Sequence, residues 1–324
     1  MYKLWLERNL PAAYAPLLAN AAVIIGCAAD TPEDPFVALG EAEAIIAGAR
    51  LRYNTGAMAH APRLRVITRT GIGLDNVNLE DATAHGIAVC YTPDAPTIST
   101  AEHTIALMFA VAKQLKQHNL ALEKGEKKDF FSSYSGLELY QAKLGIIGLG
   151  RIGGRVAYLG QALGMNVIGY DPFVGPERAA ELGIGLVTTI EAVLEVADVV
   201  TVHVPLLPET HNLMNAARLA RMKPGAILIN AARGGLVDES ALFDALSSGH
   251  LAGAGLDVFT VEPPPPDHPL LALENVLATP HIAGATLAGK DRLWQMAISQ
   301  TLQVLRGEQP AHLVNPEVWP RLTT

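Results

Sequence analysis

The sequence predicts an α/β protein with two doubly wound parallel sheets, one in each of two Rossmann-like domains. Short apolar runs alternate with segments of helical periodicity along the whole chain. This alternation is typical of βαβ units and therefore of parallel sheets. The length of 324 residues matches about two domains, each long enough to bury its own core.

The predicted strands fall into two groups. In the first third of the chain they are Lys3–Leu6, Val23–Gly26, Ala44–Ile46, Val66–Thr68 and Ala88–Cys90. In the middle they are Leu144–Gly148, Asn166–Tyr170, Val199–Val204, Ala226–Asn230, Gly253–Val258 and Val276–Ala278. An amphipathic helix is predicted at Leu79–Ala84. Two longer helices are predicted at Thr100–Lys116, which we expect to cross between the domains, and at Ala285–Leu305.

A glycine motif, Gly148-Leu149-Gly150-Arg151-Ile152-Gly153, closes the first strand of the second group and precedes a helical stretch at Val156–Leu163. Asp171 ends the next strand, 18 residues after the last glycine, close to the ~20 expected of a dinucleotide site. The glycines permit a tight turn, close approach to a pyrophosphate and helix packing, while the helix N-terminus favours phosphate. A plain glycine turn is the alternative, but the flanking strands and Asp171 favour a dinucleotide.

Composition excludes several classes of protein. Charged residues make up 17% and hydrophobic residues 50% of the chain, which is typical of a well-packed soluble enzyme rather than a disordered chain. The net charge of −8 without a basic block argues against nucleic-acid partners. Cys27 and Cys90 lie in apolar runs without metal-ligand spacing, so we expect core packing, no metal and a reducing, cytoplasmic compartment. We expect neither a signal peptide nor a membrane span.

Three residues with complementary chemistry each follow one of the last three predicted strands: Arg233, Glu262 and His281. Ligands in open α/β sheets bind outside the carboxyl ends of the strands. An imidazole can serve as base or acid near neutrality, a carboxylate can orient it and favour its protonated form, and an arginine fork binds a carboxylate at two points. The alternatives are a strand-end cap for Arg233, a solvated loop residue for Glu262 and a structural histidine for His281.

In the first domain, the segment 69–76 follows the strand Val66–Thr68 and contains two glycines. Successive backbone N–H groups in such a turn can bind an anion, for example a substrate carboxylate. A plain glycine turn is equally consistent with these residues.

At these residues the chain resembles the D-isomer-specific 2-hydroxyacid dehydrogenase family, and within it the phosphoglycerate dehydrogenase branch. The resemblance extends from about Arg69 to Thr286. It rests on Thr70-Gly71-Ile72-Gly73-Leu74-Asp75-Asn76, Ser99-Thr100-Ala101-Glu102-His103, the glycine motif, Val202-His203-Val204-Pro205-Leu206, residues 230–238, Gly255-Leu256-Asp257-Val258-Phe259 and residues 280–286.

The resemblance implies roles for individual residues. His281 would be the acid/base, Glu262 its partner and Arg233 the substrate anchor. Ile72 and Gly73 would bind the substrate carboxylate through their backbone. Separately from the resemblance, Arg50, Arg52 and Arg69 are candidates for a phosphate pocket for 3-phosphoglycerate, and the alternative is that they are ordinary surface arginines. NAD would be contacted by Gly148, Gly150, Arg151, Ile152 and Gly153, by Asp171 at the ribose, by His203, Val204 and Pro205 on the adenosine side, and by Ala231, Arg233, Asp257 and His281 towards the nicotinamide.

The resemblance also implies the domain organisation. It favours a discontinuous substrate domain, 1–98 and 286–324, and an NAD-binding domain, 99–285. Members of the family are usually homodimers joined through the helices after the crossover. The chain ends at Thr324, so we expect no counterpart of the regulatory domain that many phosphoglycerate dehydrogenases carry at the C-terminus.

The expected activity is hydride transfer between NAD(H) and a D-2-hydroxy acid or 2-oxo acid, with 3-phosphoglycerate as one candidate. A hydroxypyruvate or glyoxylate reductase and a dinucleotide-sensing corepressor of the same fold are alternatives. Formate enzymes of this scaffold pair the histidine with Gln, so Glu262 argues against formate.

Overall fold

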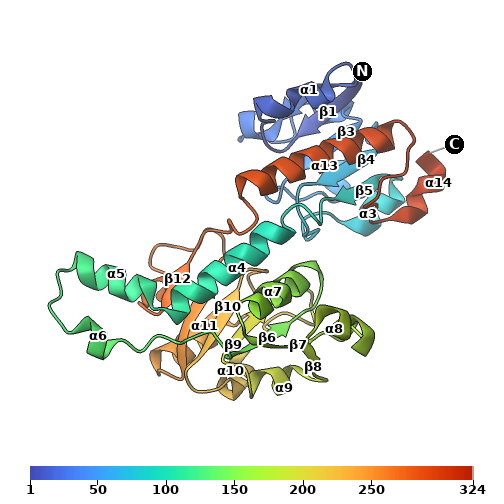
Figure 1. Ribbon diagram of the computed structural model, residues 1–324. Coiled ribbons are helices and arrows are strands. Elements are labelled where there is room, and N and C mark those ends of the chain that lie inside the picture. Colours follow the sequence, from blue (N-terminus) through green and yellow to red (C-terminus); the bar gives the residue numbers. More distant parts are fainter. Residues whose placement is uncertain (323–324) are drawn as a thin grey trace. The chain divides into compact units, whose positions relative to one another are not determined.

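The computed structural model describes residues 1–322 and divides into two compact units. Unit 1 comprises Met1–Pro96 and Ala285–Thr324, and unit 2 comprises Thr97–Gly284. Each unit contains one parallel sheet (Figure 1). The predicted fold class is therefore confirmed, including the construction of one unit from both ends of the chain.

Unit 1 has a five-stranded sheet in the order β2-β1-β3-β4-β5. Its strands are β1 (Tyr2–Leu6), β2 (Ala22–Cys27), β3 (Ala44–Ala47), β4 (Val66–Arg69) and β5 (Ala88–Tyr91). Its α-helices are α1 (Ala15–Leu18), α2 (Thr55–Ala59), α3 (Leu79–Ala84), α13 (Leu287–Leu305) and α14 (Trp319–Leu322). Short 3₁₀ turns lie at Ala12–Tyr14, Ala28–Asp30, Leu39–Glu41 and Pro316–Val318.

Both faces of this sheet are buried, which explains why its strands are continuous apolar runs. Along β3, Ala44 and Ile46 pack with Trp294 and Ile298 of α13, which lies across the sheet in Figure 1. The alternate residue Ile45 belongs to the core cluster on the other face. The buried free cysteines Cys27 and Cys90 belong to the core beneath α13, as their sequence setting predicted.

Unit 2 has a seven-stranded sheet in the order β12-β11-β10-β9-β6-β7-β8. Its strands are β6 (Lys143–Ile147), β7 (Asn166–Tyr170), β8 (Gly185–Leu186), β9 (Val199–Val202), β10 (Ala226–Asn230), β11 (Leu251–Leu256) and β12 (Val276–Ala278). The edge strand β8 was not predicted, because two residues carry no readable periodicity.

Helices cover both faces of this second sheet. Along β10, Ile227 and Ile229 pack on the side of α4 and α7, whereas Leu228 packs on the opposite side with residues of α9, α10 and α11.

No helix described within residues 1–322 is long and apolar enough to cross a bilayer. The helices of unit 2 are α4 (Thr97–Ala112), α5 (Leu115–Glu123), α6 (Phe130–Ser133), α7 (Arg151–Ala162), α8 (Pro176–Leu182), α9 (Ile190–Leu194), α10 (Ala216–Arg221), α11 (Glu239–Ser247) and α12 (Pro269–Ala272).

The predicted helix Thr100–Lys116 is wrong at its C-terminal end. Helix α4 ends at Ala112, and Gln114 adopts a left-handed conformation with φ of 52° before α5 begins. After this break, the Lys116 ammonium donates to the carbonyl oxygens of Leu273 (2.9 Å) and Val276 (2.8 Å). The chain thus turns so that Lys116 satisfies carbonyl groups beside β12, a long-range contact that local periodicity does not encode.

The strand order of each sheet reverses at one point, and such switch points are where open α/β sheets bind ligands. In unit 1 the switch lies between β1 and β3, which are followed by Glu7 and by the loop 48–53. In unit 2 it lies between β6 and β9, which are followed by the glycine motif and by His203. The switch point of unit 1 therefore has a carboxylate beside it, and that of unit 2 has a glycine turn and an imidazole.

We predict that Ile67→Ala lowers the free energy of unfolding by about 2–5 kcal/mol, because it opens a cavity in a fully buried strand of unit 1. Urea denaturation measures this change. Ile24→Ala is the matched control, since Ile24 on β2 is 40% exposed and its loss should cost about 1 kcal/mol or less. Equal losses in the two variants would contradict the assigned core.

Candidate active site

Two residues predicted to act together, His281 and Glu262, are in direct contact. His281 follows β12, Glu262 follows β11, and His281 Nδ1 lies 2.7 Å from Glu262 Oε2. The side chains are 46% and 35% exposed, so the pair is open to a small molecule. Because Nδ1 is bonded to the carboxylate, Nε2 is the ring nitrogen left for a substrate.

Arg233 is placed beside this pair by the turn that follows β10. Asn230 shapes the turn, because its amide donates to the carbonyl of Arg233 (2.9 Å) and accepts from the Ala232 N–H (3.0 Å). A side chain at Gly234 would collide with the backbone of Phe259. The glycine therefore lets the loop that carries Arg233 pack against the loop that leads to Glu262.

The electrostatics of Glu262 reflect these neighbours. Burial raises the pKa of this carboxyl, but the hydrogen bond and charge of His281, the Phe259 N–H and the charge of Arg233 together hold the pKa below its ordinary value. Glu262 is therefore ionised at neutral pH.

His281 has an unusual backbone that rests on Asp257. Its φ is +54°, in the left-handed region that residues other than glycine rarely adopt. The His281 N–H donates to the Asp257 carbonyl (2.7 Å), and the Asp257 carboxylate accepts from the N–H groups of Ile282 (2.9 Å) and Ala283 (2.8 Å). The Asp257 side chain is fully buried. It therefore bonds the backbone that follows His281 from the interior of the protein.

The glycine motif forms a tight turn between β6 and α7. Gly148 has φ of +96°, and a Cβ there would lie 2.6 Å from the carbonyl oxygen of His203. A Cβ at Gly153 would collide with the Gly148 carbonyl, whereas Gly150 has open space around it. Gly150 is also the N-cap of α7 and provides no side-chain cap. The backbone at Gly150 and the start of α7 is thus accessible to an anion.

Asp171 and His203 flank this turn. The Asp171 carboxylate, at the end of β7, accepts from the N–H groups of Leu149 (2.8 Å) and Phe173 (2.9 Å). His203 Nε2 lies 3.0 Å from Thr201 Oγ1. His203 Nδ1 is buried and has no hydrogen-bond partner among residues 1–322. Burial lowers the pKa of His203 to about 4, so the ring is neutral near pH 7.

The remaining predicted site residues lie in loops that follow strands. Val204 and Pro205 follow His203 and are half-buried and exposed, respectively, while Ala231 is buried after β10. In unit 1, Ile72 and Gly73 lie half-buried in the loop after β4, and Arg52 is exposed in the loop after β3.

Comparison with known proteins decides the family. Residues 105–283, more than half of the chain, match the family model described as D-isomer specific 2-hydroxyacid dehydrogenase, NAD binding domain. The chain belongs to the D-isomer-specific 2-hydroxyacid dehydrogenase family. Its seven-stranded unit corresponds to the NAD-binding domain of that family.

Similar proteins agree with this family. A D-3-phosphoglycerate dehydrogenase of Methanocaldococcus jannaschii is 42% identical over 287 residues, which cover 88% of this chain and 54% of that protein. A glyoxylate reductase of Korarchaeum cryptofilum is 41% identical and covers 80% of this chain and 78% of its own length. The crystal structure of an Aquifex aeolicus D-lactate dehydrogenase with NAD and lactic acid is 31% identical, with a TM-score of 0.83 over 97% of this chain and 99% of that chain. The chain spans about half the length of the phosphoglycerate dehydrogenases that it matches.

The residues at the β6–β9 switch point fit NAD. The uncapped start of α7 suits a pyrophosphate, and the fixed carboxylate of Asp171 suits ribose hydroxyls. The unpartnered Nδ1 of His203 is a buried polar atom of the kind that a bound ligand satisfies. Arg151 and Ile152, the first residues of α7, are placed to present their N–H groups to phosphate.

A buried carboxylate that the sequence analysis missed shapes the switch point of unit 1. Glu7 is 4% exposed and accepts from the N–H groups of Gly48 and Arg50 and from the Tyr53 hydroxyl, each at 2.8 Å. Burial and the Glu7 charge raise the pKa of Tyr53. The loop that carries Arg50 and Arg52 is thus wrapped around Glu7. An acid directly after a buried strand at a switch point was the available signal.

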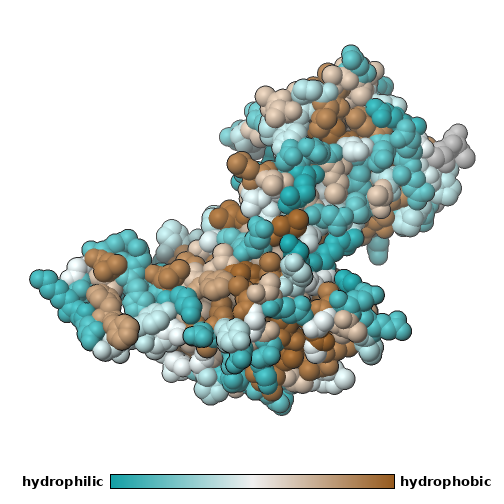
Figure 2. All heavy atoms as spheres, in the orientation of Figure 1, coloured by the Kyte–Doolittle hydropathy of each residue, from teal (hydrophilic) through white to brown (hydrophobic). Residues whose placement is uncertain are grey.

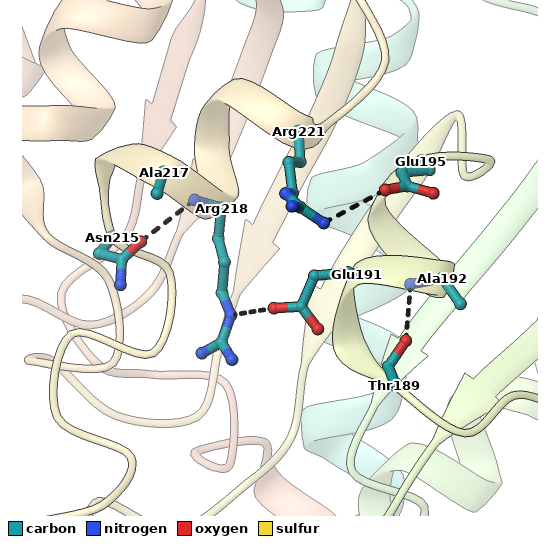
Figure 3. Close-up of a pocket in the computed structure, with 8 residues that line it drawn as sticks. All are labelled: Thr189, Glu191, Ala192, Glu195, Asn215, Ala217, Arg218 and Arg221. Carbon is teal, nitrogen blue, oxygen red and sulfur yellow. Dashed lines mark hydrogen bonds and ion pairs between the residues drawn. The ribbon is translucent and has the colours of Figure 1, made fainter.

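An open depression of about 770 Å³ lies on α9 and α10, away from these residues (Figure 3). Its charged groups neutralise one another, because Arg218 pairs with Glu191 (2.9 Å) and Arg221 with Glu195 (3.3 Å). We assign no ligand to it.

We predict that two glycine substitutions separate folding from cofactor binding. Gly153→Ala should lower both the melting temperature and NADH affinity, because its Cβ collides with the Gly148 carbonyl. Gly150→Ala should melt like the wild type, since its Cβ meets nothing and its φ of −67° suits any residue. It should still weaken NADH binding, because a methyl group keeps the pyrophosphate from the backbone. Thermal melting and NADH fluorescence titration measure both, and unchanged NADH affinity in Gly150→Ala would contradict this phosphate site.

Proposed function

We propose that this chain is an NAD-dependent oxidoreductase that transfers a hydride between NAD(H) and a D-2-hydroxy acid or 2-oxo acid. The observation that carries the proposal is the 2.7 Å contact between His281 and Glu262 beside Arg233, in a member of this dehydrogenase family. The proposal includes a domain assignment, in which residues 1–98 and 286–324 form the substrate domain and residues 99–285 form the NAD-binding domain.

In the reducing direction, bound NADH supplies a hydride to the carbonyl carbon of the 2-oxo acid. His281, protonated and held through Nδ1 by Glu262, donates the Nε2 proton to the carbonyl oxygen as it becomes an alkoxide. Arg233 binds the substrate carboxylate and polarises the carbonyl. In the oxidising direction the neutral imidazole accepts the hydroxyl proton.

NAD is favoured over NADP by the end of β7. The Asp171 carboxylate can accept hydrogen bonds from both ribose hydroxyls, and its charge repels a 2′-phosphate. The following residues Pro172, Phe173 and Val174 offer no cation to offset this repulsion.

For the substrate, we favour a 2-hydroxy acid with a second anionic group, with 3-phosphoglycerate as the leading candidate. The loop that Glu7 organises carries Arg50 and Arg52, and arginine pairs well with phosphate. The phosphoglycerate dehydrogenase relatives support this choice. Hydroxypyruvate or glyoxylate is the second candidate, because a glyoxylate reductase is 41% identical.

We further propose a cytoplasmic homodimer that binds neither nucleic acid nor membrane. Helices α5 and α6 expose large apolar side chains, with Leu115 at 55%, Leu122 at 68% and Phe131 at 94%. Figure 2 shows apolar surface over these helices. A second copy of this chain would remove it from water. The net charge of −8 supports the exclusion of nucleic acid, and the free cysteines support a reducing compartment.

The decisive experiment is turnover by the purified protein with NADH against a panel of 2-oxo acids. 3-Phosphohydroxypyruvate should give the highest kcat/KM, with hydroxypyruvate, glyoxylate and pyruvate as competitors. A dinucleotide-sensing corepressor would bind NADH but reduce none of these acids, and that result would overturn the proposal.

We predict distinct kinetic effects for His281 and Arg233. His281→Ala should lower kcat by about 10²–10⁴-fold with NADH affinity unchanged, because it removes the proton donor. Arg233→Ala should lower kcat and raise KM for the 2-oxo acid together. Arg233→Lys should rescue poorly, because an ammonium group lacks the two-point fork. Near-normal turnover by His281→Ala would assign the acid/base to another residue.

A further prediction concerns the charge of Glu262. Glu262→Gln keeps a hydrogen-bonding side chain but removes the negative charge beside His281. As the pH rises, kcat/KM for reduction should therefore begin to fall at a lower pH in Glu262→Gln than in the wild type. Oxidation should reach its plateau at lower pH for the same reason. A shift of one pH unit corresponds to about 1.4 kcal/mol. Profiles of kcat/KM against pH in both directions measure these limbs.

Acid stability provides a control for this pair. Folding lowers the pKa of Glu262, so its stabilising contribution is present above its unfolded pKa of about 4.3 and is lost as pH falls through the folded value. The stability difference between wild type and Glu262→Gln should therefore shrink in acid. If both kinetic limbs coincide with those of the wild type, Glu262 is not the charge partner.

A further inference from the structure

The stretch Ser99–His103 matches the family but received no role from the sequence, and the structure shows what its histidine touches. His103 lies on α4 with its Nε2 atom 2.9 Å from Thr279 Oγ1 and 3.6 Å from Asp257 Oδ1. Thr279 follows β12, two residues before His281. The helix holds His103 firmly, because Leu107 and Met108 of α4 are buried in the core.

The hydrogen positions in this cluster follow from counting donors. The Thr279 hydroxyl carries one hydrogen. Its oxygen, Oγ1, lies 2.6 Å from the buried carboxylate oxygen Asp257 Oδ1. That carboxylate also accepts two backbone N–H groups, so it acts as an acceptor and the threonine donates to it. Thr279 must therefore accept its second hydrogen bond from His103, which carries a hydrogen on Nε2.

The cluster supports the segment that carries His281. Asp257 holds Ile282 and Ala283 through its carboxylate and His281 through its carbonyl. A left-handed conformation at a residue other than glycine is strained and persists only when its surroundings enforce it. The Thr279 hydroxyl, oriented by His103, contributes one of the bonds that fix the Asp257 carboxylate.

We propose that His103 and Thr279 are positioning residues for the acid/base His281, acting through Asp257. The proposal rests on the proposed function, because it assigns their effect to proton transfer by His281. His103 orients the Thr279 hydroxyl, Thr279 fixes the Asp257 carboxylate, and Asp257 fixes the backbone from His281 to Ala283. Displacement of a catalytic group by about 1 Å can cost about 10²-fold in rate.

The test uses paired substitutions that differ in where they place a hydrogen-bond donor. The amide nitrogen of His103→Gln reaches the position of Nε2, whereas that of His103→Asn reaches only the position of Nδ1. Thr279→Ser keeps the hydroxyl, and Thr279→Val replaces it with a methyl group of the same size. We expect His103→Asn and Thr279→Val to lower kcat by about 10-fold or more, with NADH affinity unchanged. His103→Gln and Thr279→Ser should retain most of the wild-type kcat.

The double variant His103→Asn/Thr279→Val tests the proposed order of action. If His103 acts only through Thr279, the double variant should have the same kcat as Thr279→Val alone. Multiplied losses would show that His103 acts by another route and would overturn the proposal. Equal kcat for His103→Gln and His103→Asn would overturn it as well.

A readout independent of activity separates this proposal from the proposed function. Hydrogen exchange at the N–H groups of Ile282 and Ala283 should be slow in the wild type and in His103→Gln. It should be faster in His103→Asn and Thr279→Val, where the acceptor carboxylate is less constrained. If the wild type reduces no 2-oxo acid, the proposed function fails. If the wild type is active but the Asn and Val variants keep its kcat and exchange rates, the positioning role fails.

Discussion

The parallel alignment of β10, β11 and β12 is the constraint on which the candidate active site depends. The three strands pair in register, with Ile229 opposite Gly255 and Gly255 opposite Leu277, so their carboxyl ends meet at one edge. The alignment brings together three side chains from three different loops, Arg233, Glu262 and His281. The backbone fit between Gly234 and Phe259 and the bonds of Asp257 then refine their positions.

Much of this arrangement could be predicted from the sequence, because its signals are local. A strand followed by a glycine turn and a helix is a contiguous pattern, so the motif from Gly148 to Gly153 and the acid at Asp171 could be found without a structure. The two core sheets were likewise recognisable, because strands buried on both faces are continuous apolar runs. The exceptions are short or irregular, such as the edge strand β8 and the left-handed break at Gln114.

The residues that sequence reasoning passed over act across long sequence distances. Glu7 bonds to groups about 40 residues away, and His103 reaches Thr279 across 176 positions. Glu7 follows a strand at a switch point and His103 lies in a stretch that matches the family, but neither pattern reveals which groups the side chain contacts. Burial turns them into organising groups, because a buried polar atom must find its hydrogen bonds within the protein. Pairing of that kind is decided by the tertiary fold.

The split construction of unit 1 has a consequence for synthesis on the ribosome. The five strands of its sheet lie within the first 91 residues, but α13, which covers one face, ends at Leu305. While unit 2 is translated, the apolar side chains that later pack against Trp294 and Ile298 have no native cover. At about 5–20 residues per second, this interval lasts about ten seconds or longer. That face of the sheet therefore acquires its native cover only when the last long helix emerges.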